Sequence, residues 1–194
     1  MIYLTSDSHF SHRNILKYCN RPFSSIEEMN EAIINNWNSV VTTRDIVYHL
    51  GDFGFGNASQ LRPILERLNG RIHLVPGSHD TELLKDPNSR LWLNIEPPLL
   101  TISIKQYSPE LRYLTLCHYP MWRWYKSHFW TIHAYGHVHT SSIKKVEHPS
   151  PYAYDVGVDN NNYYPISLED LRKKIHLQIG ICQEETDGQK DVLL

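Results

Sequence analysis

Residues 2–9, Ile-Tyr-Leu-Thr-Ser-Asp-Ser-His, decide the fold class, because a short apolar strand ends there in side chains that can bind a metal. The same pattern of apolar run and polar end returns at residues 46–52 and again at residues 72–80. Apolar residues at helical spacing fill the intervals, over about residues 25–39 and from residue 61 to residue 68. The order strand, helix, strand, helix, strand predicts an α/β protein with a mostly parallel sheet.

The ends of two helices carry capping signals. Ser24, with Glu27 three residues later, predicts a capping box at the start of the first long helix. Ser167 predicts the start of a final helix over residues 168–176. The tail from residue 183 is polar and acidic, so we expect residues 183–194 to be loosely held and residues 1–182 to form a single domain.

The second half of the chain changes character. Residues 99–104 and 113–117 alternate apolar and polar side chains, which predicts two adjacent strands in an antiparallel pair. Residues 131–135 and 153–156 predict two further short strands.

Size and charge limit the classes of function. With 194 residues, 41% of them hydrophobic and 21% charged, the chain is expected to form one ordinary globular domain. The formal net charge of -2 argues against a large basic surface that follows a long nucleic acid. It leaves open a nucleotide, or a nucleic-acid end held by a few arginines.

The cysteines and the N-terminus bear on cellular location. Cys19, Cys117 and Cys182 form no close pair, which favours a reducing compartment over a disulfide framework or a thiolate zinc site. The first residues lack the pattern of a secretory signal, and no apolar run approaches the roughly 18 residues of a membrane span. We therefore expect a cytoplasmic protein with no membrane partner.

Metal-capable side chains follow five of the predicted strands. They stand in the segments Asp7-Ser8-His9, Gly51-Asp52, Gly77-Ser78-His79-Asp80, Cys117-His118 and Gly136-His137-Val138-His139. Because ligands bind where the strands of an α/β sheet reach their carboxyl edge, we expect these groups to meet in space. Carboxylates and imidazoles without thiolates fit manganese, iron, zinc or nickel.

This ordered set of motifs resembles the calcineurin-like metallophosphoesterases. Residues 5–12, His118-Tyr119-Pro120 and Gly157-Val158-Asp159 are similar to the small bacterial and phage members of that family. The resemblance implies a two-sheet β-sandwich flanked by helices. It also implies two divalent metal ions, manganese being favoured and iron, zinc or nickel remaining open.

The resemblance further implies roles for single residues. The first metal would be held by Asp7, His9 and His139, the second by His118 and His137, with Asp52 bridging both. His79 would protonate the leaving oxygen or steady the phosphate. Two cations in this arrangement can stabilise both the entering and the departing oxygen of an in-line displacement at phosphorus.

One position departs from the family's pattern. Ser78 stands where the family has an asparagine whose carbonyl oxygen ligates the second metal. A serine hydroxyl is shorter and a weaker ligand, so the second metal is expected to bind loosely or through a water. Ser78 is then a tolerated variant, an engineered change that traps substrate, or a mark of lost activity.

The segment that follows His118 has two interpretations. Residues 121–126, Met-Trp-Arg-Trp-Tyr-Lys, form either a loop whose aromatic rings pack on the core or a substrate wall. In the second case Trp124 stacks on a base and Arg123 or Lys126 meets a phosphate. Further candidates for the pocket and for phosphate contact are His12, Arg13 and Arg21.

These observations predict a metal-dependent phosphodiesterase that acts on a nucleotide or a nucleic-acid-derived ester. A phosphomonoesterase is the first alternative. The second is a non-catalytic binder, in which Ser78 leaves a pocket that captures a phosphorylated ligand without cleaving it. The oligomeric state stays open.

Overall fold

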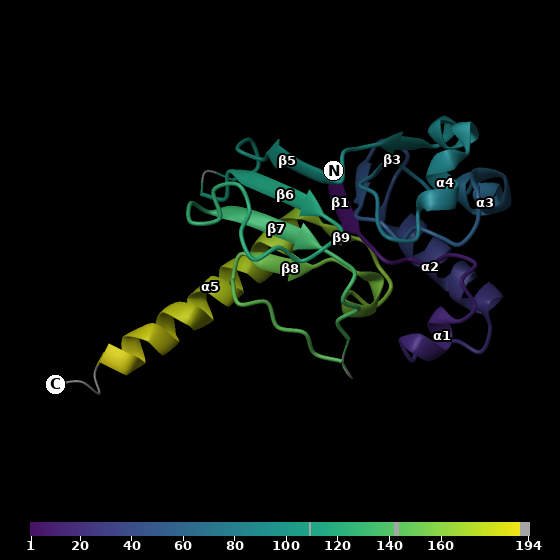
Figure 1. The fold of residues 1–194 in the computed structure, drawn as a ribbon. Helices are drawn as coiled ribbons and strands as arrows, with labels where there is room; N and C mark the ends of the chain where they lie inside the picture. The colour runs from purple at the N-terminus through teal and green to yellow at the C-terminus, as the bar shows by residue number, and fades with distance from the viewer. Residues whose placement is uncertain (109, 142–143, 191–194) are drawn as a thin grey trace.

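Two sheets form the centre of the protein in the computed structural model, which describes residues 1–108, 110–141 and 144–190 (Figure 1). The first sheet has the order β4-β3-β2-β1-β9 and the second the order β5-β6-β7-β8. The strands of the first sheet are β1 (Ile2–Thr5), β2 (Ile46–His49), β3 (Arg71–Leu74), β4 (Leu93–Ile95) and β9 (Ile166–Ser167). The strands of the second are β5 (Leu99–Ser103), β6 (Tyr113–Cys117), β7 (Thr131–Tyr135) and β8 (Ala153–Asp155).

Parallel pairing dominates both sheets. Strands β1 to β4 run parallel, and β9 is antiparallel to β1. In the second sheet β5 is antiparallel to β6, as predicted, while β6, β7 and β8 are parallel. The carboxyl ends of β6, β7 and β8 therefore point toward the first sheet (Figure 1). This arrangement gathers the strand ends of both sheets in one region.

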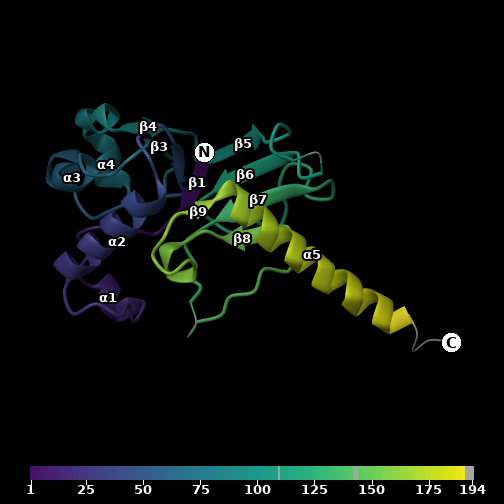
Figure 2. The same ribbon diagram turned by 180° about the vertical axis from the view of Figure 1, so that it is seen from behind.

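Five α-helices accompany the sheets in the described part of the chain. They are α1 (Ile15–Tyr18), α2 (Ile26–Val40), α3 (Ala58–Leu65), α4 (Thr81–Lys85) and α5 (Leu168–Lys190), with short 3₁₀ turns at Pro87–Leu91 and Val158–Asn160. Helices α1 to α4 lie beside the first sheet, and α5 crosses the back of the second (Figure 2). The fold is thus the predicted α/β arrangement of two sheets flanked by helices.

Side-chain alternation divides the apolar residues between two cores. Tyr3, Val47 and Ile72 are register partners on one face of the first sheet and pack with the apolar stripe of α2. Leu4 points to the opposite face, because successive side chains of a strand alternate. It belongs to a second core, which it shares with Leu114, Leu116, Ile132, Leu171 and Ile175 of the second sheet and α5. This second core joins the two sheets.

Several helix boundaries differ from the prediction, and α3 spans Ala58–Leu65 where residues 61–68 were predicted. The N-cap of α2 is Ser25, whose side chain accepts from the backbone N–H of Glu28, so the cap lies one residue later than the predicted pair. Helix α5 continues past His176, because Ile179 extends the buried apolar spacing of Leu171 and Ile175. Residues 191–194 of the predicted tail lie outside the described residues. None of the helices in the described ranges is long and apolar enough to cross a bilayer.

A loop over residues 119–130 covers the outer face of β7. The Trp124 ring lies 5.1 Å from the ring of His133, and its Nε1 donates to the carbonyl oxygen of Thr131 at 3.0 Å. The Nε2 of His133 accepts from the backbone N–H of Met121 at 3.0 Å. His133 is fully buried, so the loop is fixed to the sheet through a neutral imidazole.

This contact predicts that stability falls in mild acid. Burial lowers the pKa of His133 to about 4, from about 6.5 in the unfolded chain. Because the folded pKa is the lower one, its contribution is fully present above pH 6.5 and is lost as the pH falls toward 4. We expect the free energy of unfolding to lose about 3 kcal/mol over this window from His133 alone. Urea unfolding in EDTA at several pH values measures this loss of unfolding free energy.

A matched pair of variants isolates this effect. His133→Gln removes the titrating group, so its unfolding free energy should depend less steeply on pH between 6.5 and 4. His128→Gln changes an exposed histidine of the same loop and should keep the wild-type dependence. Equal slopes for His133→Gln and the wild type would refute the assignment.

Candidate metal centre

Backbone contacts between the two sheets bring the strand ends together. The chain beyond β1 bridges the chain beyond β8, with Ser6 paired to Gly157, and the backbone N–H of Asp7 donates to the carbonyl oxygen of Gly51 at 3.0 Å. On the second sheet the N–H of Gly136 donates to the carbonyl oxygen of His118 at 2.9 Å. The loops that carry the candidate ligands are therefore hydrogen-bonded to one another.

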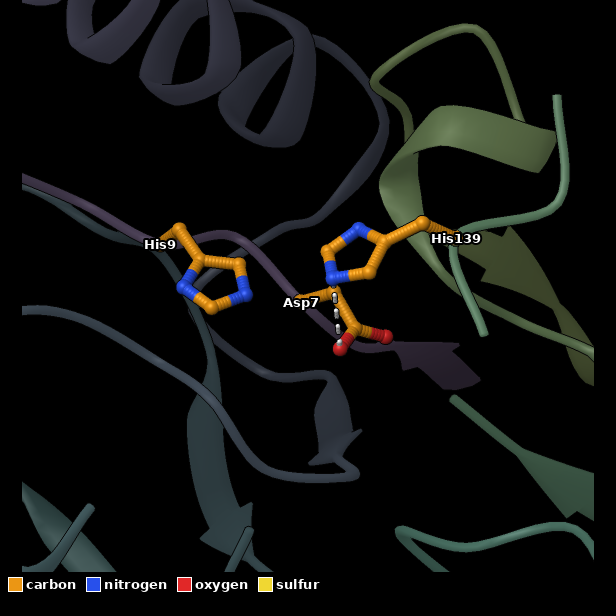
Figure 3. A group of neighbouring side chains, drawn as sticks. All are labelled: Asp7, His9 and His139. Carbon is orange, nitrogen blue, oxygen red and sulfur yellow. Dashed lines mark ion pairs between the residues drawn. The ribbon is translucent and has the colours of Figure 1, made fainter. Parts of the chain in front are cut away.

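Asp7, His9 and His139 form the first group of potential ligands (Figure 3). One ligand atom of each lies within 4.8 Å of the others. The rings of His9 and His139 stack with centroids 5.1 Å apart. The Nε2 of His139 lies 3.8 Å from Oδ1 of Asp7, the contact that Figure 3 marks with a dashed line.

Asp52, His118 and His137 form the second group. Oδ2 of Asp52 lies 3.5 Å from Nε2 of His118 and 3.7 Å from Nε2 of His9, which belongs to the first group. Ligand atoms around a divalent ion with bonds of about 2.1 Å are separated by roughly 3.0–3.4 Å. One carboxylate oxygen therefore lies between the two groups, close to ligand spacing from both.

Two buried nitrogen atoms show that these groups fit metal ions. Among the residues that the structure describes, no hydrogen-bond partner reaches Nε2 of His9 or Nε2 of His118. The Nδ1 of His118 donates to the carbonyl oxygen of Leu50 at 2.7 Å, which leaves a lone pair on its Nε2. A buried polar atom without a partner is costly in free energy. A divalent cation bound in each group would give the unpartnered nitrogen of that group a partner.

The backbone at the candidate ligands is strained. Asp7, His9, Asp52, His137 and His139 all have positive φ, between 50 and 70°. A left-handed conformation is uncommon for a residue with a Cβ, and such strain gathers at functional sites. Of the six residues in the two groups, only His118 lacks a positive φ. It directly follows β6.

Two glycines allow the loops to approach this closely. A Cβ on Gly136 would overlap Oγ of Ser6 and the carboxylate of Asp7. Gly51 has a φ of +86°, and a Cβ there would collide with the backbone of Gly77. Any side chain at either position would push a candidate ligand out of place.

Arg21 and Asp159 hold the first group in place through hydrogen bonds. Oδ2 of Asp159 accepts from Nδ1 of His139 at 2.8 Å, which directs Nε2 of that ring toward Asp7. The Arg21 guanidinium donates to both oxygens of Asp159, at 2.9 and 2.8 Å. It also donates to the carbonyl oxygens of Asp7 at 2.6 Å and Ser8 at 3.0 Å.

These contacts correct the prediction for Arg21. Its side chain is fully buried and its donors are used within the protein, so it does not face a substrate phosphate. The role of Asp159 was missed in the sequence, although the segment Gly157-Val158-Asp159 was the signal that could have revealed it.

Burial shifts the pKa values of the carboxylate and the imidazoles of the first group in opposite directions. Burial raises the pKa of Asp7 to about 6. Burial also lowers the pKa of His9, and the Arg21 charge adds to that effect. Burial disfavours the charged form of His139, but hydrogen bonds to Asp159 and Cys19 and the Asp7 charge outweigh it and raise the pKa to about 10. A metal ion therefore competes with a proton at His139.

Asp80 and Ser78 both contact the Asp52 segment. The buried carboxylate of Asp80 accepts from the backbone N–H groups of Asp52 at 2.9 Å, Phe53 at 2.9 Å and Gly77 at 2.7 Å. Sequence reasoning missed this structural role. The Ser78 hydroxyl lies 3.1 Å from Oδ2 and 3.3 Å from Oδ1 of Asp52, and it donates to this carboxylate.

His79 and His12 lie beside the first group. The His79 ring is exposed and 5.4 Å from the His9 ring, and its backbone N–H donates to Oδ1 of Asp52 at 2.8 Å. His79 also lines a hollow of about 290 Å³ with Phe55. The His12 ring stacks on Phe55 at 4.9 Å, and its Nδ1 lies 3.2 Å from Nδ1 of His9.

The other predicted substrate contacts divide into exposed and buried ones. Arg13 and Arg123 are exposed, and Arg13 lies 3.9 Å from Glu27. Of the two interpretations for Trp124, core packing is observed and base stacking is wrong, because its ring is buried against the second sheet. Tyr119, which was not among the predicted substrate contacts, is half-exposed with its ring 4.8 Å from the rings of His118 and His137.

The fold and site together define a class: an α/β sandwich protein with metal-capable carboxylates and imidazoles where the strands of its two sheets end. The chain belongs to the calcineurin-like phosphoesterase family, whose model matches residues 1–178. This family uses divalent metal ions.

Similar proteins are found among archaea and bacteria. An uncharacterised protein of Methanocaldococcus jannaschii is 38% identical over 191 residues, 90% of each chain. The crystal structure of a protein of unknown function from Aquifex aeolicus is similar with a TM-score of 0.68 and 26% identity, covering 89% of this chain and 98% of that one. The nuclease MPE of Pseudomonas putida gives a TM-score of 0.47 and 19% identity, over 71% of this chain and 61% of the nuclease.

Proposed function

We propose that this protein hydrolyses phosphodiesters of nucleotides or nucleic acids with the help of two divalent cations, manganese being the favoured ion. The observation that carries the proposal is the position of Oδ2 of Asp52, between the unpartnered Nε2 atoms of His9 and His118 at 3.7 and 3.5 Å. Asp7, His9 and His139 would hold one cation, His118 and His137 the other, and Asp52 both.

The side chains around this centre have distinct tasks. When bound, the cations supply Lewis-acid stabilisation of the charge that develops on the phosphoryl oxygens. His79, exposed at the rim, donates a proton to the departing oxygen, and its backbone N–H orients the Asp52 carboxylate. Asp159 keeps the proton of His139 on Nδ1, so that Nε2 faces Asp7.

The rim of the centre favours an ester that carries a base. Tyr119 places its ring beside His137, and Trp122 and Arg123 follow as exposed side chains. An aromatic face stacks on any nucleobase, and a guanidinium pairs with phosphate. These groups support a nucleotide or nucleic-acid substrate over a small ester.

Ser78 supports a second candidate function. Its hydroxyl donates to Asp52, whereas an asparagine carbonyl would offer a further ligand oxygen. A loosely held second cation would leave a pocket that binds a phosphorylated ligand without cleaving it.

One comparison separates these functions. We expect the wild type with manganese to hydrolyse bis(p-nitrophenyl) phosphate faster than p-nitrophenyl phosphate. Ser78→Asn should raise kcat/KM for the diester by about tenfold, because an added ligand oxygen tightens the second cation. Ser59→Asn, an exposed serine of α3, is the matched control and should change nothing.

The other outcomes decide against the proposal. Faster turnover of the monoester would identify a phosphomonoesterase. The wild type could instead bind manganese and hydrolyse neither ester, with activity appearing only in Ser78→Asn. This result would identify a phospholigand-binding protein in which Ser78 prevents catalysis.

A further inference from the structure

A hollow of about 690 Å³ lies at the end of the second sheet that is remote from the metal centre. Its lining residues are Lys105, Glu110, Arg112, Tyr113, Lys126, Phe129 and Trp130, which include three cations and one carboxylate. Tyr113 and Thr131 are register partners at the start of β6 and β7, whereas His118 and His137 follow the ends of these strands. At roughly 3.3 Å per residue, Tyr113 is about 16 Å from His118 along the strand.

Two lysines converge in this hollow on the ring of Tyr113. Nζ of Lys126 lies 4.8 Å and Nζ of Lys105 5.3 Å from the centroid of the Tyr113 ring. Neither forms an ion pair within the ranges that the structure describes. The carboxylate of Glu110, which also lines the hollow, lies 3.9 Å from Nε2 of His176 on α5. The hydrogen bond to Lys105 lowers the pKa of the Tyr113 hydroxyl. The hollow is therefore a local positive site on a protein of net charge -2.

Exposed aromatic rings connect the hollow with the metal centre. The loop that starts after His118 returns to Thr131, and the buried Trp124 holds it on the sheet between these points. Its exposed rings are Tyr119, Trp122, Tyr125, Phe129 and Trp130. Large exposed aromatic groups gathered on one segment mark a binding surface.

The chemistry of this surface fits a single nucleic-acid strand. Rings that stack on bases, combined with cations that meet the backbone, are the general means of binding single strands without sequence preference. A second copy of this chain fits less well, because the two unpaired ammonium groups would need carboxylates at the centre of an apolar contact.

We propose that the Lys105–Lys126 hollow is a second binding site for a nucleic-acid strand whose scissile diester lies at the metal centre. The strand's backbone phosphates contact the two ammonium groups, and its bases stack on the exposed rings of residues 119–130. This proposal rests on the proposed function, and it specifies the substrate as an oligonucleotide that extends beyond one nucleotide.

The kinetic experiment compares a long and a short substrate. In Lys105→Ala with Lys126→Ala, the KM for a single-stranded DNA 12-mer should rise about tenfold while kcat stays unchanged. Hydrolysis of bis(p-nitrophenyl) phosphate should stay at the wild-type rate, because this ester cannot span the distance. Arg44→Ala with Arg71→Ala removes the same charge from two exposed positions, in the turn before β2 and at the start of β3, and is the control. An unchanged KM, or an equal rise in the control, would overturn the proposal.

A binding experiment separates this proposal from the proposed function. Fluorescence anisotropy with a labelled 12-mer in EDTA reports binding without turnover. Loss of two phosphate contacts should reduce the slope of log K against log salt concentration by about 1.4. A reduced slope in a protein that hydrolyses no diester would refute only the proposed function. An unchanged slope in an active enzyme would refute only the second site.

Sedimentation velocity tests whether a second copy of the chain binds this surface instead. We expect the wild type and Phe129→Ala to sediment alike. A wild-type dimer that dissociates in Phe129→Ala, together with no binding of the 12-mer, would assign the surface to a second copy of the chain and overturn the proposal.

Discussion

Replacing Asp52 by asparagine should lower kcat for bis(p-nitrophenyl) phosphate by on the order of a thousandfold. The variant removes the one negative charge that lies between Nε2 of His9 and Nε2 of His118, at 3.7 and 3.5 Å. In the proposed two-metal centre, the repulsion between the cations would then no longer be offset. Turnover with manganese and the metal content after dialysis, measured by mass spectrometry, test both consequences.

This substitution should leave the fold intact. Asp52 has a φ of 53°, and asparagine tolerates this left-handed conformation better than most residues. Its amide oxygen can still accept from the backbone N–H of His79. Asp170→Asn makes the same chemical change on an exposed turn of α5 and should keep full activity. More than a tenth of wild-type turnover in Asp52→Asn would show that this carboxylate does not bridge the metals.

Replacing Arg21 by methionine should cost about 3–5 kcal/mol of unfolding free energy, because the buried Asp159 carboxylate loses its guanidinium partner and keeps only the hydrogen bond from His139. Arg21 also donates to the carbonyl oxygens of Asp7 and Ser8, so the strained segment at the first metal group loses its support. We expect weaker manganese binding as well as lower stability. Urea unfolding and metal titration measure the two effects.

A control and a double variant make this prediction specific. Arg13→Met removes an arginine that is 80% exposed and should change stability by less than about 0.5 kcal/mol. Adding Asp159→Asn to Arg21→Met removes the buried charge that has lost its arginine partner and should recover part of the lost stability. If Arg21→Met is as stable as Arg13→Met, the buried pair does not hold the site together.

The fold was predictable where local sequence determines local structure. The sequence predicted β7 at residues 131–135, as observed, and the adjacent antiparallel pair β5 and β6 was confirmed. Strands β4 and β9 were missed, because segments of three and two residues contain too little periodicity. The end of α5 was also misjudged, since it depends on Ile179 reaching the core.

The candidate ligands were predictable from their order and their position after strands. The structure brings Asp7, His9 and His139 into one group and Asp52, His118 and His137 into another. Their roles in catalysis and metal binding remain proposals. The substrate side was less predictable, because sequence alone does not show which of two neighbouring tryptophans is buried. Trp124 is buried and Trp122 is exposed.

By itself, the sequence determined the family, the alternation of strands and helices, and the residue types available for a metal centre. Only the tertiary structure decided that Asp52 lies between the two groups, that Arg21 supports Asp159 instead of a substrate, and that Lys105 and Lys126 both approach the Tyr113 ring far from the candidate ligands. The reason is physical. Periodicity and motif order are local properties of the chain, whereas burial and pairing depend on contacts such as that of Arg21 with Asp159, which are 138 residues apart.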